Sequence, residues 1–259
     1  MKRLFVLILS SLILAIFSSC SISLYTYEDA DKYTSSSEFS LDSKITDVEI
    51  NWINGDINIS MGAENIVSVK EENYGNYPLF YYLDDTTLKI EFVESGTNNN
   101  VFNSLEKDLF ITLPIAQNSL VDLEVNLING NVNFGTSAFN DVTVDVVNGN
   151  VTIERIIAID MDFKMVNGNA VINSLNSPSF DLEKVNGDLI INNIGGTTKI
   201  DINSVNGTDI IYVNEVQGYE TNIKSLGSFS SDYDNLKSYG AKQVFIDYDA
   251  VNGSLIIKK

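Results

Sequence analysis

Pairs of aspartates two positions apart are the residues of this sequence whose type and spacing best suit chemistry. Asp160 and Asp162 form one such pair, and Asp247 and Asp249 form another. On a β-strand, side chains two positions apart point to the same face, so each pair brings two carboxylates together. Such pairs suit a Ca²⁺ site or the acid and base of a glycosidase. The alternative is that they occupy outward positions of strands, where charged side chains are hydrated.

Most other catalytic groups are missing from the sequence. The chain has no histidine, and its single cysteine, Cys20, lies near the N-terminus, which excludes His-dependent triads and zinc hydrolases. The recurring glycines are not followed by Lys-Ser or Lys-Thr, so there is no phosphate-binding loop. The Gly-Gly-x-Gly-x-Asp calcium repeat is also absent. We therefore predict a protein without enzymatic activity or cofactor, and for the two aspartate pairs we favour outward strand positions over a Ca²⁺ site.

A cluster of aromatic residues is the second candidate site. Tyr74, Tyr77, Tyr81 and Tyr82 lie close together in the sequence, with Phe80 among them. Aromatic side chains favour interfaces, so the four tyrosines are a candidate platform for a sugar or a protein. The alternative, which we favour, is that the cluster closes the first coils of the fold.

The first 20 residues have the three parts of a secretory signal. Lys2 and Arg3 precede an apolar stretch that ends at Phe17, and Ser18-Ser19-Cys20 follows. The apolar stretch is shorter than the roughly 20 residues that span a bilayer. Ser18-Ser19-Cys20 resembles a lipobox, with Phe17 in place of the usual leucine. We expect a signal peptide over 1–19, a lipid on Cys20 and a tether over 20–40; the alternative is an ordinary signal peptide with an incidental free thiol.

The composition is strongly acidic. The chain has 16 basic and 35 acidic residues, and removal of Lys2 and Arg3 with the signal leaves a formal charge of −21. Nucleic acid is excluded as a partner, because contacts to phosphates need clustered Lys or Arg. The predicted partners are the membrane, through the lipid anchor, and a protein or glycan at the cell surface.

The strongest signal in the sequence is an Asn-Gly repeat. Five copies follow one another at spacings of 19, 19, 19 and 20 residues, and a degenerate copy stands at Leu226-Gly227. Further copies stand at Asn54-Gly55 and Asn252-Gly253. A fixed period near 20 indicates stacked supersecondary units. Glycine supplies the positive φ of a turn, and the asparagines serve the turn or stack in a ladder of amide hydrogen bonds. The five central copies are Asn129-Gly130, Asn148-Gly149, Asn167-Gly168, Asn186-Gly187 and Asn206-Gly207.

Apolar residues alternate with polar ones on both sides of each Asn-Gly. Val142 and Val144 stand six and four residues before Asn148, and Val151 and Ile153 stand three and five after it. Two topologies fit this pattern. In a hairpin, the flanking strands pair with each other, which sets core positions against polar ones such as Arg155. In a solenoid, each strand pairs with its equivalent in the next coil, and like residues meet. The pattern favours the solenoid.

The repeat defines the domain that we expect. A β-solenoid should occupy 41–259, with a less regular N-terminal part over 41–113 and regular Asn-Gly coils over 114–259. The final strand ends in Lys258-Lys259, and lysines there would discourage edge-to-edge pairing of a terminal coil.

Three segments resemble a bacterial putative-adhesin family of β-strand-repeat domains of unknown function. They are VEINWINGDINI at 48–59, LKI at 88–90 and KDLFITLP at 107–114, and the Asn-Gly coils follow them. The similarity runs from about Ile45 to the C-terminus. It implies an all-β fold, a right-handed single-stranded parallel β-helix with coils of 19–20 residues, on the bacterial envelope. Its motifs concern architecture and carry no catalytic residues.

Together these features predict a non-catalytic lipoprotein of the cell envelope, an adhesin or a surface-binding scaffold. A structural or regulatory envelope protein that acts through a membrane partner is the alternative. A carbohydrate-active enzyme is a third possibility, which the aspartate pairs alone support.

Overall fold

The computed structural model describes residues 24–62, 66–114 and 121–259. The expected signal peptide (1–19) and Cys20 lie outside these residues. The described part is all-β, with strands and two short 3-10 helices, η1 (Ala30–Lys32) and η2 (Asn99–Ser104). No helix among residues 24–62, 66–114 and 121–259 is long and apolar enough to cross a membrane.

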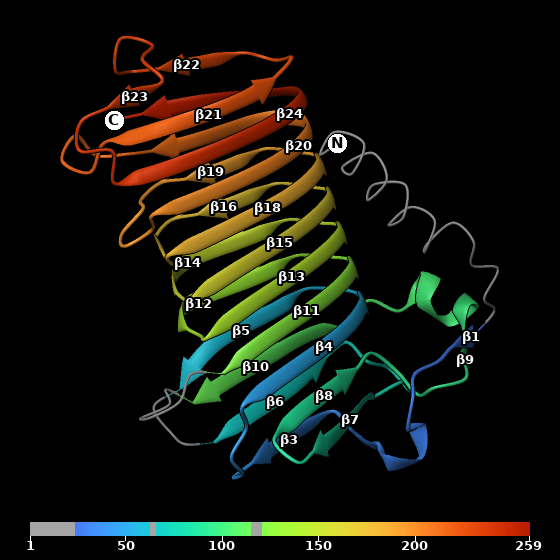
Figure 1. Ribbon diagram of the computed structural model, residues 1–259. Coiled ribbons are helices and arrows are strands. Elements are labelled where there is room, and N and C mark those ends of the chain that lie inside the picture. The colour runs from blue at the N-terminus through green and yellow to red at the C-terminus, as the bar shows by residue number, and fades with distance from the viewer. Residues whose placement is uncertain (1–23, 63–65, 115–120) are drawn as a thin grey trace.

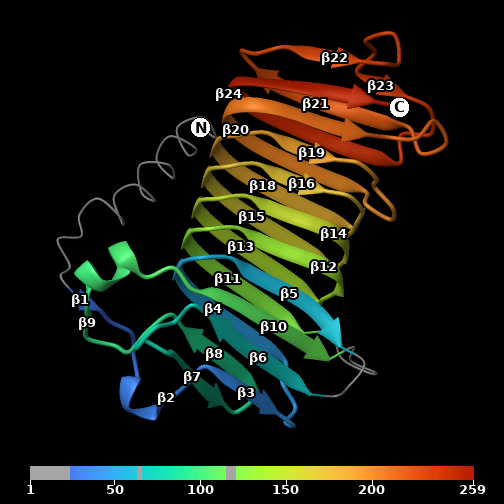
Figure 2. The same ribbon diagram turned by 180° about the vertical axis from the view of Figure 1, so that it is seen from behind.

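The strands form two walls joined along one edge by the Asn-Gly corners (Figures 1 and 2). The first wall stacks, in spatial order, β8 (Thr87–Glu91), β4 (Asp47–Asn54), β11 (Asp122–Asn129), β13 (Asp141–Asn148), β15 (Asp160–Asn167), β18 (Ser179–Asn186), β20 (Lys199–Tyr212), β24 (Val244–Lys258) and β21 (Tyr219–Ser225). The second wall stacks β6 (Val67–Glu72), β10 (Asp108–Pro114), β5 (Ile57–Gly62), β12 (Val132–Ala138), β14 (Val151–Ile157), β16 (Ala170–Ile172), β19 (Leu189–Ile191), the second halves of β20 and β24, and β22 (Phe229–Ser231), with β17 (Leu175–Asn176) beside β14.

Pairing between successive coils is parallel and in register. Val144 of β13 lies beside Val125 of β11 and Phe163 of β15, each 19 residues away. The strands on either side of an Asn-Gly do not pair with each other in the described coils: β13 pairs with β11 and β15, and β14 with β12, β16 and β17. The hairpin topology is therefore wrong, and the described chain has a β-solenoid-like fold in which equivalent residues of neighbouring coils stack.

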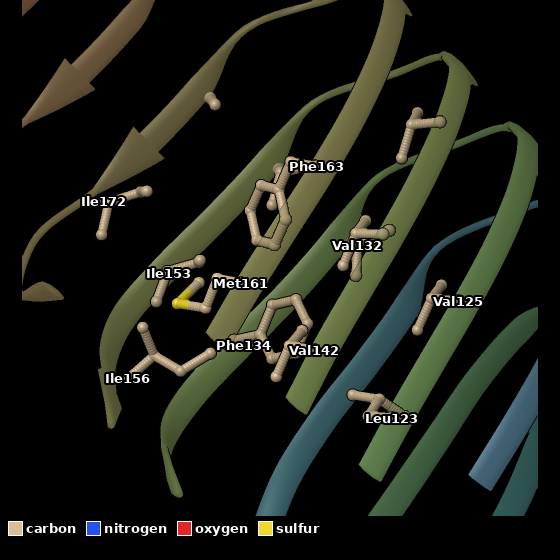
Figure 3. Close-up of a cluster of buried hydrophobic side chains, with 14 of the residues drawn as sticks. Leu123, Val125, Val132, Phe134, Val142, Ile153, Ile156, Met161, Phe163 and Ile172 are labelled. Atoms are coloured by element: carbon tan, nitrogen blue, oxygen red, sulfur yellow. The ribbon is translucent and has the colours of Figure 1, made fainter. Parts of the chain in front are cut away.

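Inward side chains of both walls meet in one continuous core. Val142, Phe163 and Ile153 are among the residues that point into the space between the walls (Figure 3). Each buried aliphatic or aromatic side chain contributes roughly 1.5–3 kcal/mol. Ordering one residue costs on the order of 1–2 kcal/mol for the backbone alone. A single regular coil buries about six such side chains, so it depends on backbone hydrogen bonds and packing that it shares with its neighbours.

At both ends the spatial order of coils departs from the order in the chain. The coil of Asn54 stacks on that of Asn129, 75 residues later, and the coil of Asn252 stacks on that of Asn206. The degenerate Leu226-Gly227 copy, expected to follow Asn206, instead lies beyond β24. β24 pairs with β20 along both walls because it continues through its own Asn-Gly corner in the same register. Residues 219–231 instead divide into two short strands.

This arrangement corrects the expected role of the C-terminal strand. β24 is an internal strand between β20 and β21–β22, so Lys258 does not lie on a terminal edge strand. The outer coil at this end is 219–231, and β23 (Ser238–Tyr239) pairs with part of β21 in antiparallel fashion.

Residues 24–41 differ from the expected tether. They form β1 (Leu24–Tyr25), β2 (Thr34–Ser36) and β3 (Glu38–Leu41), which pair antiparallel with β9 (Thr97–Asn98), β7 (Leu79–Asp84) and β6 respectively. β9 lies within the polar stretch 94–100. Alternating side chains in 34–41 allow this segment to cover the open edges of β6 and β7.

Candidate functional site

A ladder of asparagine side chains follows the corners. Asn148 donates its Nδ2 to Asn129 Oδ1 at 3.0 Å, and Asn167 donates to Asn148 at 2.9 Å. The same bond joins the copies at 54, 186, 206 and 252, at 2.7–3.2 Å. Each interior asparagine therefore donates to one coil and accepts from the next. The side chains are largely exposed, so the ladder forms a polar line along the edge of the solenoid.

Close backbone contact requires the glycine after each asparagine from the first corner, at Gly55, to the corner at Gly207. Gly168 has φ +146°, and a Cβ atom there would lie 1.7 Å from the carbonyl oxygen of Gly149. Gly187 and Gly207 have the same conformation and the same contact with the glycine one coil away. Only glycine combines this φ with such an approach of two backbones. The role of these glycines is thus to set the spacing of coils.

A second ladder lies two residues after each asparagine. Asn150 donates Nδ2 and its backbone N–H to Asn131 Oδ1 at 3.0 and 3.1 Å. The backbone N–H groups of Asn169, Asp188 and Thr208 each bond the side-chain oxygen of the preceding coil, at 2.7–3.0 Å. Sequence reasoning missed this ladder, although the signal was present as Asn or Asp at the position after glycine.

Replacing Asn167 with alanine should lower the free energy of unfolding by about 1–3 kcal/mol, because two amide hydrogen bonds are lost at roughly 0.5–1.5 kcal/mol each. Urea unfolding followed by circular dichroism measures this. Thr152→Ala, on the exposed face of β14, is the matched control and should stay within about 0.5 kcal/mol of the wild type. An Asn167→Ala value equal to that of the control would mean that the ladder adds nothing to stability.

The structure keeps the two candidate aspartate pairs apart. Asp160 and Asp162 lie on β15, while Asp247 and Asp249 lie on β24, with β18 and β20 between them. Asp162 is 3.7 Å from Lys164, and Asp247 accepts a hydrogen bond from Asn222 and lies 3.7 Å from Lys224. Within the described residues, no three acidic or Cys side chains gather as metal ligands would.

The outer face of the first wall is a broad acidic surface. Two columns of outward positions, seven and five residues before each asparagine, are mostly acidic. Burial, with repulsion from neighbouring carboxylates, raises the pKa of Asp141 and Asp162. Burial and repulsion by Asp162 also raise the pKa of Glu183. The acidic members of the two columns are Asp47, Asp122, Asp141, Asp160, Glu49, Glu124, Asp162, Asp181, Asp201 and Asp247.

The raised carboxylate pKa values give an unusual pH dependence of stability. A carboxyl whose pKa is higher in the folded than in the unfolded chain binds its proton more tightly when folded, so stability rises as pH falls from neutral towards that pKa. Scanning calorimetry at constant ionic strength should give a melting temperature at pH 5.5 that is higher than at pH 7.5 by about 2–4 °C, which corresponds to about 1 kcal/mol at this size.

The matched variant for this experiment neutralises two of the carboxylates. Burial raises the pKa of Asp145 as well as that of Glu183. Asp145→Asn with Glu183→Gln should therefore reduce the difference between the two pH values. A melting temperature that falls on acidification would contradict the pKa directions.

The tyrosine cluster lies under the N-terminal segment. Tyr81 stacks on Phe39 of β3 with ring centroids 3.7 Å apart, and the ring of Tyr82 lies 5.6 Å from that of Tyr33. Tyr77 is 41% exposed, and its carbonyl accepts a hydrogen bond from a buried lysine. Tyr74 is partly exposed in the turn before it. The four tyrosines thus do not form one platform, since Tyr81 and Tyr82 are covered by residues 33–39.

Two buried ion pairs were missed by sequence reasoning. Lys107 lies 2.8 Å from Glu71 with both side chains fully buried, and its Nζ also donates to the carbonyls of Tyr77 and Phe92. Burial lowers the pKa of Lys107 to about 8 and raises that of Glu71. The indole N–H of Trp52 donates to the Lys107 carbonyl at 2.8 Å, which ties the pair to the first Asn-Gly corner.

The second pair lies inside the corner at the other end. Lys184 Nζ is 3.0 Å from Asp209 Oδ1 and donates to the Gly187 carbonyl at 2.7 Å. Burial raises the pKa of Asp209. Burial and the facing carboxylate of Asp209 also raise the pKa of Tyr248. Neither pair is open to solvent, so neither is a site for a ligand.

A groove beside the first coils is a hollow that a ligand can reach. One wall of the groove is formed by residues 25–27. They belong to a side arm that also includes β9 and η2 and lies beside the corner end of β4 in Figure 1. The arm is held there by Tyr25, whose hydroxyl donates to Glu91, and by Asn54, which donates to the carbonyl of Phe102. The groove encloses about 510 Å³ and its floor is the outer face of β4, β11, β13 and β15.

Comparison with known proteins gives one family and several similar folds. The family described as Toastrack DUF4097 matches residues 37–225, most of the chain. No curated protein matches the sequence. A candidate adhesin from Parabacteroides distasonis has a similar structure, with a TM-score of 0.51 and 14% identity over 88% of this chain and 97% of that one.

Two further structures resemble the chain less closely. A candidate adhesin from Bacteroides fragilis has a TM-score of 0.48 and 14% identity, covering 87% of this chain and 97% of its own. A candidate lipid-binding protein, also from Parabacteroides distasonis, has a TM-score of 0.44 and 13% identity, covering 86% and 96%.

Proposed function

Since this chain belongs to the Toastrack DUF4097 family, we propose that it is an exported, non-catalytic protein of the bacterial cell envelope that presents a β-solenoid to a binding partner. A lipid on Cys20 anchors it to the membrane, and a protein or glycan at the cell surface is the partner. The names of the Parabacteroides and Bacteroides structures agree with a surface role.

The observation that carries the proposal is the regularity of the outer surface. Each coil adds a residue of similar type at the same place, and two ladders of side-chain hydrogen bonds tie the coils together. A surface that is held by rigid strands is preorganised, so a partner that binds it loses less free energy to ordering. The lack of a catalytic constellation in the sequence supports binding over chemistry.

The finer architecture is part of the same proposal. We infer a right-handed, single-stranded parallel β-helix whose coils contain 19–20 residues. Support comes from the parallel pairing at these offsets, such as Leu123 with Val142 and Ser179 with Lys199. Connections between parallel strands are right-handed in nearly all proteins.

The anchor is tested by metabolic labelling with palmitate in the native host. The wild-type chain should incorporate the label and remain with the membrane, and Cys20→Ala should do neither. An unlabelled wild-type chain would remove the lipid anchor from the proposal.

Binding is tested with the full chain on intact cells. Cells that carry the protein and cells that lack it are incubated with host-matrix proteins and glycans, and saturable binding is measured. We expect saturable binding that depends on the protein. Uniform absence of such binding counts against the adhesin role.

A further inference from the structure

An apolar ridge runs along the floor of the groove. The position just before each asparagine faces outward, yet it holds a β-branched apolar residue in every coil. Ile128, Val147 and Val166 line the groove, with Ile53 at its first coil. Outward positions of a solenoid are normally polar. The ridge continues beyond the groove through Val185, Val205 and Val251.

Beside the ridge runs a column in which two buried carboxylate oxygens lack hydrogen-bond donors among the described residues. Asp145 lies in the groove, and its Oδ1 atom is buried without a hydrogen-bond partner in the described part of the chain. The same is true of Glu183 Oε2, in the same column two coils further along. Lys164 stands between them, and its Nζ lies 3.7 Å from Asp162. Buried carboxylate oxygens gain most from a charged donor, so this column favours a partner with lysine or arginine.

The spacing of the coils fits one particular element. Neighbouring strands lie about 4.8 Å apart, and one turn of an α-helix rises about 5.4 Å. A helix that lies along the solenoid axis therefore sets about one turn on each coil. Its apolar residues at i, i+3 or i+4, and i+7 can follow the ridge, while basic residues on the adjacent flank reach Asp145 and Glu183. The four strands of the groove floor span about 14 Å, or nearly three turns.

We propose that the groove between the side arm and the outer face of β4, β11, β13 and β15 binds a cationic amphipathic helix of a protein partner. This inference rests on the proposed binding function and names the chemistry of the partner. The strong negative charge of the chain supplies the complementary field. The aromatic side arm closes one side of the groove, where Tyr25 and Tyr27 pack with ring centroids 5.7 Å apart.

The test uses the full chain in nanodiscs of phosphatidylcholine, with empty nanodiscs as the blank. The probe is an 18-residue helical peptide of leucine and lysine, and the comparison peptide has glutamate in place of lysine. Thermophoresis should show saturable binding of the lysine peptide above the blank and at least tenfold weaker binding of the glutamate peptide. Equal binding of both peptides, or none of either, overturns the proposal.

Variants locate the site. Val147→Asp should weaken binding of the lysine peptide at least tenfold, whereas Ile157→Asp, at an aliphatic position that is 38% exposed on the second wall, should leave it unchanged. Asp145→Asn with Glu183→Gln should weaken it about fivefold and reduce its salt dependence. Photo-crosslinking from the peptide should label β11, β13 or β15. Crosslinks to the second wall, or loss of binding in Ile157→Asp alone, would place the peptide elsewhere.

The result also separates this inference from the proposed function. If the cells bind a matrix protein or glycan while the lysine peptide does not bind the groove, the surface role stands and the helix partner is wrong. If both fail, the binding function itself is wrong.

Discussion

Gly168→Ala should reduce the free energy of unfolding by at least about 4 kcal/mol or prevent folding altogether. The new Cβ atom would lie 1.7 Å from the carbonyl oxygen of Gly149, far closer than the 3.0 Å below which such contacts essentially never occur. The φ of +146° is also unfavourable for any residue with a Cβ. The hydrogen bond from the Gly149 N–H to the Asn167 carbonyl also holds the two corners close together. Effects above about 4 kcal/mol arise from a short list of such causes, and backbone strain is one of them.

Gly135→Ala is the matched control for this experiment. Gly135 lies on β12 of the same solenoid, and a Cβ there would meet its nearest neighbour, the Ile59 carbonyl oxygen, at an ordinary 3.7 Å. Urea unfolding should find it within about 1 kcal/mol of the wild type. If Gly168→Ala were equally mild, the corners would be able to separate, and the close stacking of coils described above would not hold in solution.

The sequence was informative wherever the pattern repeats. Alternation on both sides of Asn148 predicted which residues are buried, and the mismatch of core and polar positions favoured the solenoid over the hairpin. Identical Asn-Gly corners, however, do not specify which copies are neighbours. The stacking of Asn54 on Asn129 and of Asn252 on Asn206 depends on pairing across 75 and 46 residues. No local pattern encodes pairing over such distances.

The groove was missed for a different reason. Its floor could have been recognised in the sequence, because the residue before each asparagine is Ile or Val in every copy. Its other wall could not, since residues 24–27 look like a polar tether. Individual hydrogen bonds hold the arm in place, such as those from the Tyr25 hydroxyl to Glu91 and from the Gly96 N–H to the Tyr25 carbonyl. These contacts depend on tertiary structure and have no periodic signature.

The buried pair of Lys184 and Asp209 was hidden because a charged residue in a strand is normally taken as outward. A comparison of equivalent positions in successive coils reveals the pair. Lys184 occupies the position held by Leu127, Val146 and Met165 in other coils, and Asp209 occupies that of Val132, Val151 and Leu189. These two charged residues belong to adjacent coils and face each other across one corner, so each supplies the opposite charge that the other needs.

Replacing one partner of this pair should be far more harmful than replacing both. Lys184→Met leaves a buried carboxylate without its cation, and Asp209→Leu leaves a buried ammonium, so each should lower the free energy of unfolding by about 3–5 kcal/mol. The double variant restores the residue types that Met165 and Leu189 already supply at these two positions. It should lie within about 1 kcal/mol of the wild type, since well-packed apolar residues often replace a buried ion pair without loss.

A double-mutant cycle by urea unfolding measures this coupling directly. Its matched control is the exposed pair of Lys199 and Asp181, whose side chains are 48% and 39% exposed at 3.3 Å. Removing either partner there should change stability by less than about 1 kcal/mol, because solvent screens exposed pairs. If the single variants at 184 and 209 lost as little stability as this control, water would reach the corner. Additive losses in the double variant would mean that the two side chains do not interact, and that the columns of neighbouring coils are not in the register on which the whole fold depends.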